Sequence, residues 1–476
     1  MNIFIQILIL LFIVLMATPS EALQVVERPA APSGLGVQGA GGQVVPLKVT
    51  ERPAFSVSPS NFNSFATPLA YYQGNIYVVS VEPPVGASNG MNLRTVVRKG
   101  YEDKGEWIWE TTVVDDSTLD DVYHTQASIA IDKAGYVHIA YNMHHMPWQY
   151  AVSNKPGDIS SFDFRGDAIS LAEKGIVKNL NKTPFPSIGT AAIPGNQITY
   201  PAFFYDRSGD LYITYRFATR PNRSSFSDRG YAYAIARYDV VNRQWSQLGA
   251  QVKVTINDAD LPAGLQEGIL KVFVFSEDWI PQLLRIFFDK TNRMHFSWTW
   301  REFYENAPFL KSSYAYSPAI GERFYQADGT QFALPMRAVQ AGLLVTNNPS
   351  TELISPLAYL TVDPNGTPYV VTLEKGTSSV VRFYDNKAKR WSKAEPMPEG
   401  AQLMEIDDAG HHWAFAAGLT LYKRNVATEP WSKMYEDTEL SRFGFFKVLY
   451  VRKQNLFLVF SQSEDGKSAK VYEIRY

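Results

Sequence analysis

Residues 123–148 read YHTQASIAIDKAGYVHIAYNMHHMPW, and this segment contains the structural unit that recurs along the chain. Two apolar runs, 127–131 and 136–141, flank the turn Asp132-Lys133-Ala134-Gly135. An aspartate followed closely by a glycine favours a tight reversal, because aspartate binds nearby backbone amides and glycine accepts a left-handed backbone. The stretch therefore predicts a β-hairpin.

Four of the seven histidines of the chain lie in this segment. Residues equally distant from a hairpin turn lie side by side, so His124, eight before Asp132, and His144, twelve after it, leave the strands at the end opposite the turn. His145 follows at the same edge, whereas His138 lies mid-strand and is expected to be an ordinary strand side chain. Loops at strand ends often carry binding and catalytic groups, so we predict that the other three histidines are functional.

The same unit of turn and apolar strand recurs along the chain, at spacings of 43 to 83 residues. Such spacings are typical of four-stranded propeller blades with loops of unequal length. No stretch shows a sustained helical period. We therefore predict an all-β protein, a seven-bladed β-propeller in a single domain. The predicted second strands begin at Ile76, Tyr136, Leu211, Met294, Tyr369, His412 and Leu456.

A second repeat supports this interpretation. Tyr238-Asp239 precedes Trp245 by the same interval at which Tyr384-Asp385 precedes Trp391, with a looser copy from Tyr422 to Trp431. These segments are expected to be hairpins of the outer strands.

The start of the chain predicts export. Residues 3–16 are almost continuously apolar, and Ser20-Glu21-Ala22 has the small residues of a cleavage site, so 1–22 is predicted to be a signal peptide. We interpret residues 23–48, rich in Gly, Pro, Ala and Val, as an N-terminal arm or linker, and 49–476 as the propeller. The expected location is secreted or periplasmic.

Charge and cysteine content exclude several classes of function. The net charge of −2 argues against a protein dominated by nucleic-acid binding or, after signal cleavage, by membrane binding. The absence of cysteine excludes disulfides, thiolate nucleophiles and thiolate metal sites. The expected protein is a monomer held by a large core, and a local cationic pocket remains compatible with its overall charge.

Aligning the hairpins by their turns brings further residues to the histidine edge. Asp206 falls on Asp132, which places Tyr200, six before the aspartate, and Arg216, ten after it, beside His144. Arg301 and Lys375 lie twelve residues after the aspartates of the fourth and fifth hairpins, the offset of His144. Both are predicted to bind substrate, as is His145, although surface cations at strand ends are an alternative. The edge that carries these residues, which we call the mouth of the propeller, is therefore predicted to be cationic.

These residue types favour one chemistry over two others. An arginine amid the histidines disfavours a divalent cation, and a glycosidase needs two opposed carboxylates. Asp115, Asp116, Asp120 and Asp121 precede the hairpin, but such a cluster is expected to be solvated. In β-elimination on a uronate, arginine neutralises the carboxylate, histidine or tyrosine removes the C5 proton, and a tyrosine hydroxyl protonates the departing O4.

At these residues the sequence resembles the ulvan lyases of polysaccharide lyase families 24 and 25, and more broadly the BNR-repeat-like secreted propellers. The resemblance rests on His124 and His144 flanking one hairpin, on Thr199-Tyr200-Pro201 and on Tyr215-Arg216. Family 25 is the more similar. The resemblance implies cleavage of ulvan between 3-sulfated rhamnose and glucuronate or iduronate, which leaves a 4,5-unsaturated uronate. It implies that His124 and Tyr200 are the acid/base pair, that His144 lies beside them and that Arg216 neutralises the carboxylate.

The resemblance implies no cofactor for the chemistry, but a structural divalent cation, zinc or calcium, with unknown ligands. His295 is a candidate ligand, with a buried strand histidine as the alternative. His411 and His412 lie at a turn away from the mouth and are left out of the site. Two rival functions are a sialidase-like glycoside hydrolase, whose Ser-x-Asp-x-Gly-x-Thr-Trp boxes do not occur here, and a non-catalytic propeller that binds sulfated or uronate polysaccharide.

Overall fold

The computed structural model describes residues 47–57, 65–83, 92–119, 126–146, 148–166, 198–219, 230–255, 267–302, 307–346, 351–376, 379–416, 418–437, 446–463 and 465–476. The predicted signal peptide, the arm up to residue 46, His124, Asp120 and Asp121 lie outside these residues. The described residues belong to one compact unit, Leu47–Tyr476.

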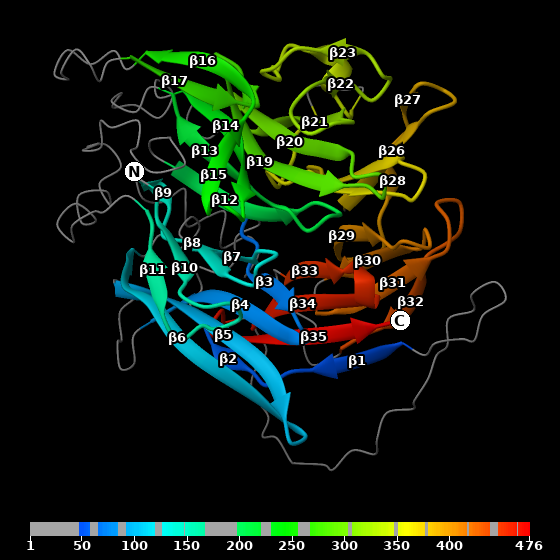
Figure 1. Cartoon of the computed structure of the whole chain (residues 1–476). Helices are drawn as coiled ribbons and strands as arrows, with labels where there is room; N and C mark the ends of the chain where they lie inside the picture. The colour runs from blue at the N-terminus through cyan, green and yellow to red at the C-terminus, as the bar shows by residue number, and fades with distance from the viewer. Residues whose placement is uncertain are drawn as a thin grey trace, which may run out of the picture. The chain divides into compact units, whose positions relative to one another are not determined.

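Within these ranges the strands form seven antiparallel blades (Figure 1). Blade 1 is β3 (Leu69–Tyr72), β4 (Asn75–Glu82), β5 (Asn92–Asp103) and β6 (Glu106–Leu119). Blade 2 is β7 (Ser128–Ile131), β8 (Val137–Ala140), β10 (Tyr150–Ser153) and β11 (Phe162–Phe164). Blade 3 is β12 (Ile198–Tyr205), β13 (Leu211–Ala218), β14 (Tyr231–Asp239) and β15 (Gln244–Leu248), joined by β9 (His144–Met146) and β18 (Val274–Phe275).

Blade 4 is β19 (Trp279–Phe288), β20 (Met294–Glu302), β21 (Phe309–Ser317), β22 (Phe324–Tyr325) and β23 (Gln331–Phe332). Blade 5 is β24 (Tyr359–Val362), β25 (Pro368–Leu373), β26 (Ser379–Asp385), β27 (Arg390–Trp391) and β28 (Glu395–Pro396). Blade 6 is β29 (Ala401–Ile406), β30 (His412–Ala416), β31 (Thr420–Arg424) and β32 (Ser432–Tyr435). A separate two-stranded ribbon consists of β16 (Ala250–Thr255) and β17 (Glu267–Val272).

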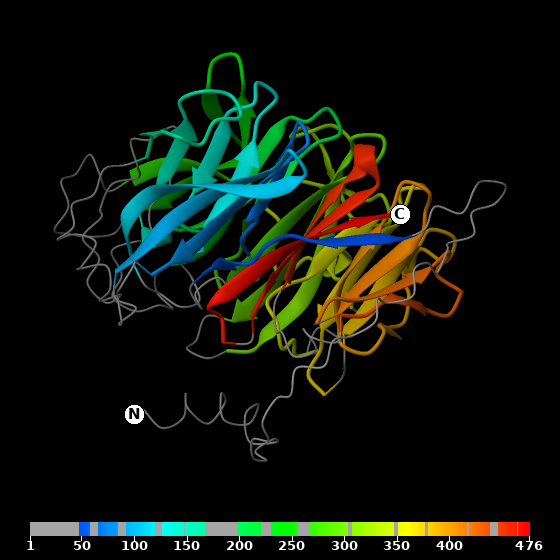
Figure 2. The same cartoon turned by 90° about the horizontal axis from the view of Figure 1, so that it is seen from below.

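Blade 7 combines the two ends of the described unit. It contains β33 (Phe446–Val451), β34 (Leu456–Gln462), β35 (Ser468–Arg475) and β1 (Lys48–Glu51), with β2 (Phe55–Ser56) also paired to β35. Figure 2 shows β1 lying alongside β35, and Lys48 is opposite Arg475. The ring is thus closed by pairing an N-terminal strand with the C-terminal one.

The seven predicted second strands are β4, β8, β13, β20, β25, β30 and β34, so the predicted seven-bladed propeller is confirmed. The predicted outer hairpins are confirmed as well, since Tyr238 is opposite Trp245 and Tyr384 is opposite Trp391. Apart from strands, the described residues contain two short 3₁₀ turns, η4 (Ala341–Leu343) and η6 (Arg452–Gln454). No helix among them is long and apolar enough to cross a membrane.

Aspartates set the turns between the first and second strands of blades 2 to 6. Each Oδ1 accepts the backbone amide of the residue four later, at 2.8–3.0 Å. In blades 2 and 4 the other oxygen accepts from a buried histidine six later, and in blade 6 from Trp413. The aspartate therefore fixes both the turn and the second strand. These aspartates are Asp132, Asp206, Asp289, Asp363 and Asp407.

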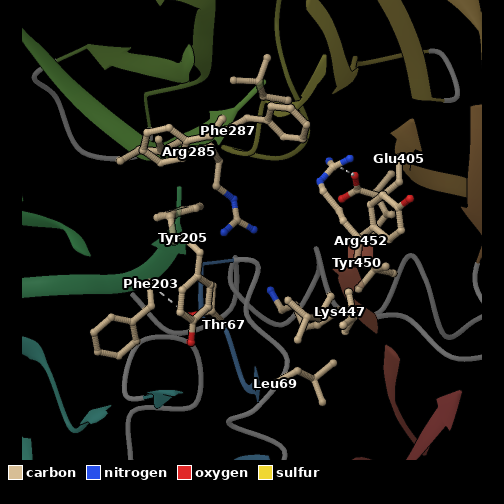
Figure 3. Close-up of a pocket in the computed structure, with 18 of the residues that line it drawn as sticks. Thr67, Leu69, Phe203, Tyr205, Arg285, Phe287, Glu405, Lys447, Tyr450 and Arg452 are labelled. Carbon is tan, nitrogen blue, oxygen red and sulfur yellow. Dashed lines mark hydrogen bonds and ion pairs between the residues drawn. The ribbon is translucent and has the colours of Figure 1, made fainter. Parts of the chain in front are cut away.

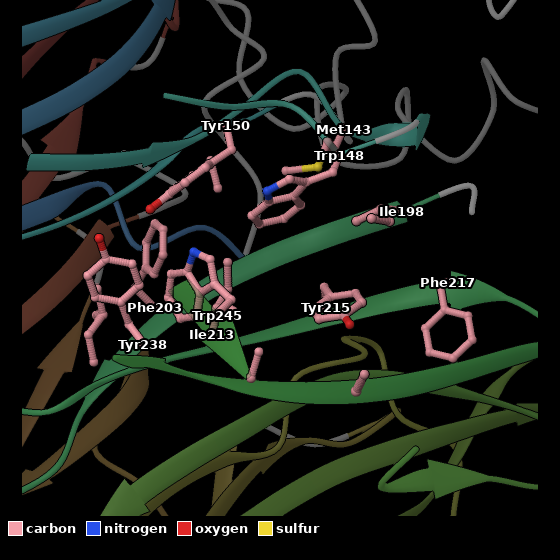
Figure 4. Packing of buried hydrophobic residues seen from close by; sticks show 14 of the residues in the cluster. Met143, Trp148, Tyr150, Ile198, Phe203, Ile213, Tyr215, Phe217, Tyr238 and Trp245 are labelled. Carbon is pink, nitrogen blue, oxygen red and sulfur yellow. The ribbon is translucent and has the colours of Figure 1, made fainter. Parts of the chain in front are cut away.

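An aromatic cluster joins blades 2 and 3 (Figure 4). Trp148 stacks on Tyr150 with ring centroids 5.4 Å apart, and Phe203 stacks on Trp245 at 6.1 Å. Large aromatic side chains contribute much of the stabilising buried area of a core. This cluster fixes the relative position of the strands that carry the predicted site.

Arg52, which directly follows β1, is expected to contribute strongly to ring closure. Its Nε donates a 2.6 Å hydrogen bond to Glu473 of β35, and its guanidinium carbon lies 3.8 Å from the centroid of the Trp107 ring. We expect Arg52→Ala to lower the free energy of unfolding by about 2 kcal/mol, because Glu473 is mostly buried and the stacking is lost. Urea denaturation measures this change.

The matched control is Lys470→Ala, which breaks the ion pair between Lys470 of β35 and Glu51 of β1. Both partners are partly exposed, so the expected loss is under about 1 kcal/mol. Equal losses in the two variants would contradict a special role for Arg52 in closure.

The stability of the protein is expected to fall in acid because of its buried histidines. Burial, with Arg424 beside it, lowers the pKa of His412 to about 3. The Nδ1 atom of this ring accepts a 3.1 Å hydrogen bond from Arg424, which a protonated ring could not do. The unfolded chain binds a proton near pH 6.5 and the folded chain does not, so stability is complete above 6.5 and is lost as pH falls toward 3.

Within this window, each unit by which the pH falls lowers the free energy of unfolding by about 1.4 kcal/mol for one such histidine. His412→Gln is therefore expected to show a smaller loss of unfolding free energy than the parent protein when pH is lowered from neutral into the window. An unchanged pH slope in urea denaturation would disprove the contribution of His412.

Candidate functional site

A row of side chains crosses four strands at the edge opposite the aspartate turns. His144 of β9 is opposite Thr199 of β12, Thr199 is opposite Arg216 of β13, and Arg216 is opposite Tyr233 of β14. Directly opposed residues of antiparallel strands point to the same face, and neighbouring strands are about 4.8 Å apart. The backbones of His144 and Arg216 are therefore about 10 Å apart on one face.

The predicted neighbourhood of His144, Tyr200 and Arg216 is present, but β9 forms it differently from the hairpin alignment. β9 pairs with β12 of blade 3 and is not part of the blade 2 sheet. His144, 9% exposed, is thus positioned by backbone hydrogen bonds of the blade that also carries Tyr200 and Arg216.

Tyr200 occupies a β-bulge in the inner strand of blade 3. The register runs from Thr199 opposite Arg216 to Ala202 opposite Thr214, so β12 has one residue more than β13 between these pairs. Tyr200 itself has a φ of +60°, a backbone conformation that residues other than glycine rarely adopt. A bulge redirects a side chain, and such strain costs of order 1–3 kcal/mol and gathers at functional sites.

Arg216 is held between aromatic rings with a neutral hydrogen-bond partner. Its guanidinium carbon lies 4.5 Å from the centroid of the Tyr200 ring and 4.8 Å from that of Tyr231. One terminal nitrogen donates a 3.1 Å hydrogen bond to the side-chain oxygen of Gln282. The side chain is only 2% exposed, and within the described residues its Nε has no hydrogen-bond acceptor and its guanidinium no ion pair with a carboxylate.

Gln282 is a site residue that the sequence analysis missed. It lies in blade 4, 4% exposed, just before a second bulge at Leu283, which has a φ of +46°. Gln282 precedes Asp289 by seven residues, as Thr199 precedes Asp206, so the two positions are equivalent in the repeat. Aligning the fourth hairpin backwards from Asp289, as well as forwards to Arg301, could have found it.

Tyr233 is the last residue of the row and lies opposite Arg216. Its hydroxyl accepts the backbone amide of Leu283 at 3.0 Å, which ties blade 3 to the bulge of blade 4. Burial raises the pKa of Tyr233 far above its ordinary range, so this phenol stays neutral. The ring of Phe65 also packs against Tyr200, with ring centroids 4.8 Å apart.

The remaining predicted residues differ in their surroundings. Arg301 is half-buried at the end of β20, and its Nε donates to the carbonyl of Ala307 at 3.0 Å. Lys375 is largely exposed and forms an ion pair with Glu352. His145 lies in β9, and His124 lies outside the described residues. The substrate-binding roles of Arg301, His145 and Lys375 stay predictions.

Two strand histidines are structural. His138 is fully buried, its Nε2 donates to Asp132 at 3.1 Å, and its Nδ1 is bonded to Tyr150, as expected of an ordinary strand side chain. His295 contacts Asp289 and Tyr314 in the same way in blade 4, which matches the buried-histidine alternative. The part of the chain that is described contains no group of three or more His, Asp or Glu suited to a metal ion. The predicted structural cation stays a prediction.

Two residues of the acidic cluster expected before the hairpin lie in a strand. Asp115 and Asp116 lie in β6, where Asp115 is half-buried opposite Thr95 and Asp116 is exposed. Burial and the Asp115 carboxylate together raise the pKa of Tyr141. Asp115 is therefore engaged with a neighbouring tyrosine, and the expectation of a solvated loop does not hold for this residue.

The arrangement suits binding of a carboxylate next to a proton-transfer group. A guanidinium without a carboxylate partner attracts an anion, and the attraction is stronger away from water. The Tyr200 hydroxyl and the His144 imidazole can both exchange protons near such an anion. The row of His144, Thr199, Arg216 and Tyr233 contains no carboxylate that would compete for Arg216.

Comparisons with known proteins agree on the fold. The model of the BNR repeat-containing family matches residues 70–397. The crystal structure of the polysaccharide lyase Uly1 superposes with a TM-score of 0.60 and 12% identity, over 89% of this chain and 99% of that chain. A PL25 ulvan lyase bound to -[GlcA(1-4)Rha3S]- superposes with a TM-score of 0.57 and 12% identity, over 89% and 95% of the two chains. No curated protein matches the chain in sequence.

The hydrogen bond from Arg216 to Gln282 is expected to be important for stability. Gln282→Met keeps a similar volume but removes the oxygen that accepts from the buried guanidinium. Leaving a buried charged donor without this acceptor should cost about 2 kcal/mol of unfolding free energy in urea denaturation. Gln282→Glu, the control, keeps an acceptor and should lose less, whereas a Met variant as stable as the parent would contradict the expected role.

Proposed function

This chain belongs to the BNR repeat-containing family, and from the geometry around Arg216 we propose that it is a polysaccharide lyase. The observation that carries the proposal is a buried guanidinium without a carboxylate partner among the described residues, stacked on Tyr200 at a strained bulge. The proposed substrate is an anionic, sulfated, uronate-containing polymer, ulvan. The fold shared with Uly1 and the PL25 ulvan lyase supports this choice.

In the proposed reaction Arg216 binds the uronate carboxylate. Neutralising this charge acidifies the C5 proton, because the carbanion that forms is stabilised as an enolate-like species. A base, His124 or Tyr200, removes that proton. The electron pair forms the C4–C5 double bond, the bond between C4 and its glycosidic oxygen breaks, and the leaving oxygen takes a proton from the acid of the pair.

Tyr200 is the proposed proton donor to the leaving oxygen. Its ring lies against Arg216, which places the hydroxyl near the site where the carboxylate would bind. His144, held in register with Thr199, lies beside this pair and orients the sugar or a water molecule. Burial of Arg216 means that the carboxylate loses water when it binds, which strengthens its attraction to the cation.

Two other functions are separable by the products that form. A sialidase-like hydrolase would create new reducing ends without a double bond, and would need carboxylates such as Asp115 at the site. A binding propeller would hold the polymer without cleaving it. The first experiment therefore incubates the purified mature chain with ulvan and follows the ultraviolet absorbance of the unsaturated uronate.

Tyr200→Phe is expected to reduce the rate of this absorbance rise by about 100-fold to 10,000-fold, the usual contribution of a general acid or base. Polymer binding should be nearly unchanged, because only a hydroxyl is lost. Tyr71→Phe is the control, since that hydroxyl binds Gln454 at the turn end of the propeller. A rate that is the same in Tyr200→Phe and the parent would disprove the role of Tyr200, and reducing ends without absorbance would disprove the lyase.

A further inference from the structure

A cavity of about 1130 Å³, which we call the central cavity, is lined by the inner strands of the blades. Consecutive inner strands contact one another around it, from β3 through β7, β12, β19 and β24 to β29, and β33 contacts β3. Most of its wall is apolar, with side chains such as Leu69, Phe203 and Leu357. A space of this volume is large enough for a small molecule.

One lysine projects into the central cavity from blade 7. Lys447 belongs to β33, the inner strand of that blade, and lines the cavity. Figure 3 shows its amine pointing into the open space, across from the guanidinium of Arg285 in β19. Lys447 is half-buried. Because it faces the cavity, a ligand inside the cavity can contact its amine, although the amine lies away from bulk water.

The amine of Lys447 makes no hydrogen bond and no ion pair within the described residues. Burial and the nearby Arg285 lower its pKa well below the ordinary range of a lysine. An apolar wall and a neighbouring cation both disfavour the ammonium form, because neither offers the charge a compensating partner. The folded protein therefore holds a larger share of Lys447 as the free amine than of an exposed lysine.

The carboxylate nearest to this part of the wall is engaged with other groups. Glu405 of β29 accepts a 2.6 Å hydrogen bond from Tyr359 and lies 4.0 Å from Arg452. Its charge also acts on Arg285, where it opposes the lowering of the arginine pKa by burial. Glu405 thus compensates the two arginines, whereas the charge that acts on Lys447 is that of Arg285.

The other titratable groups of the cavity do not restore the ammonium form of Lys447. Burial raises the pKa of Tyr205, Tyr359 and Tyr450, so these phenols stay neutral. The remaining charged residues of the wall lie in or next to the turns at one end of the cavity. They are Asp132, Lys133, Asp206, Arg207, Asp408 and Lys453.

We propose that Lys447 is a nucleophilic amine that binds a small aldehyde or ketone covalently, as an imine, in the central cavity. A lysine that has lost its proton in an apolar pocket or beside another cation is a nucleophile toward a carbonyl carbon. The site does not depend on the proposed lyase activity, because neither Arg216 nor Tyr200 takes part in it.

Imine formation at Lys447 balances without an oxidant or a reductant. The electron pair of the lysine nitrogen forms a bond to the carbonyl carbon, and the π pair of the carbonyl group moves to its oxygen. Both protons of the amine pass to that oxygen, the carbon–oxygen bond breaks, and the oxygen leaves as water. The products are the imine and one molecule of water. The apolar wall protects the imine, because it excludes the water that would hydrolyse it.

Reductive trapping in the full chain at pH 7 tests the site. The protein is incubated with glyceraldehyde and sodium cyanoborohydride, which reduces an imine to a stable secondary amine, and peptide mass mapping identifies the modified lysines. Lys447 is expected to react at least about tenfold faster than the exposed Lys375, because each unit by which a lysine pKa is lowered gives about tenfold more free amine at this pH. A rate at Lys447 no higher than that at Lys375 would overturn the proposal. So would a Lys447 adduct that forms without cyanoborohydride and survives dialysis, since it would not be an imine.

The pH dependence of trapping separates a free amine from a lysine that is only accessible. As pH rises from about 7 to about 9, the free fraction of an exposed lysine increases about tenfold per unit, whereas that of Lys447 is already closer to its limit. The ratio of modification at Lys447 to that at Lys375 is therefore expected to fall, by up to about tenfold per pH unit. A constant ratio would show that Lys447 titrates like an exposed lysine and would refute the proposal.

Lys447→Met and Lys133→Met are the matched variants. Lys133 also lines the central cavity, where it forms an ion pair with Asp210. The fast phase of glyceraldehyde uptake is expected to be lost in Lys447→Met and kept in Lys133→Met. A fast phase of equal size in Lys447→Met and the parent protein would contradict the assignment. Peptide mapping of the parent protein needs no variant, so it decides the question even if Lys447→Met does not fold.

Discussion

The pairing of β1 with β35 closes the ring of blades and so holds every blade in position. A propeller has its inner strands at a fixed distance from the axis only if the ring is closed, because an open ring would leave two sheet edges and an exposed wall. The chain has no cysteine, so closure relies on hydrogen bonds and ion pairs between its ends. The burial of Arg216 depends on this closed ring.

Within the closed ring the site depends on sheet hydrogen bonds more than on loops. β9 leaves blade 2 to pair with β12, which places His144 in register with Thr199 and Arg216. The buried aromatic cluster that includes Trp148, Tyr150, Phe203 and Trp245 packs blade 2 against blade 3 and so fixes these strands relative to one another. Rigid support of this kind keeps a proton-transfer group within the narrow geometry that a reaction requires.

The sequence predicts the fold well because the decisive signals are local. The aspartates bind amides only four residues away, so each turn is encoded in a few positions. Aligning those turns placed Tyr200 and Arg216 at the same edge as His144, but did not predict that β9 pairs with β12. Features that depend on distant partners were missed. The hydrogen bond from Arg216 to Gln282 joins residues 66 apart, and nothing near Tyr200 in the sequence revealed its bulge. The closing role of β1 depends on a strand at the far end of the chain.

The bulge at Leu283 connects the candidate site to the wall of the central cavity. It separates Gln282, which reaches Arg216 at the candidate site, from Arg285, which points into the central cavity. Because of the extra residue, Gln282 lies opposite Thr299 and Arg285 opposite Ser297, so both side chains leave the same face of the sheet although they are three residues apart. The same bulge directs the amide of Leu283 to the hydroxyl of Tyr233, so one irregularity in β19 ties blade 4 to two residues of the candidate site in blade 3.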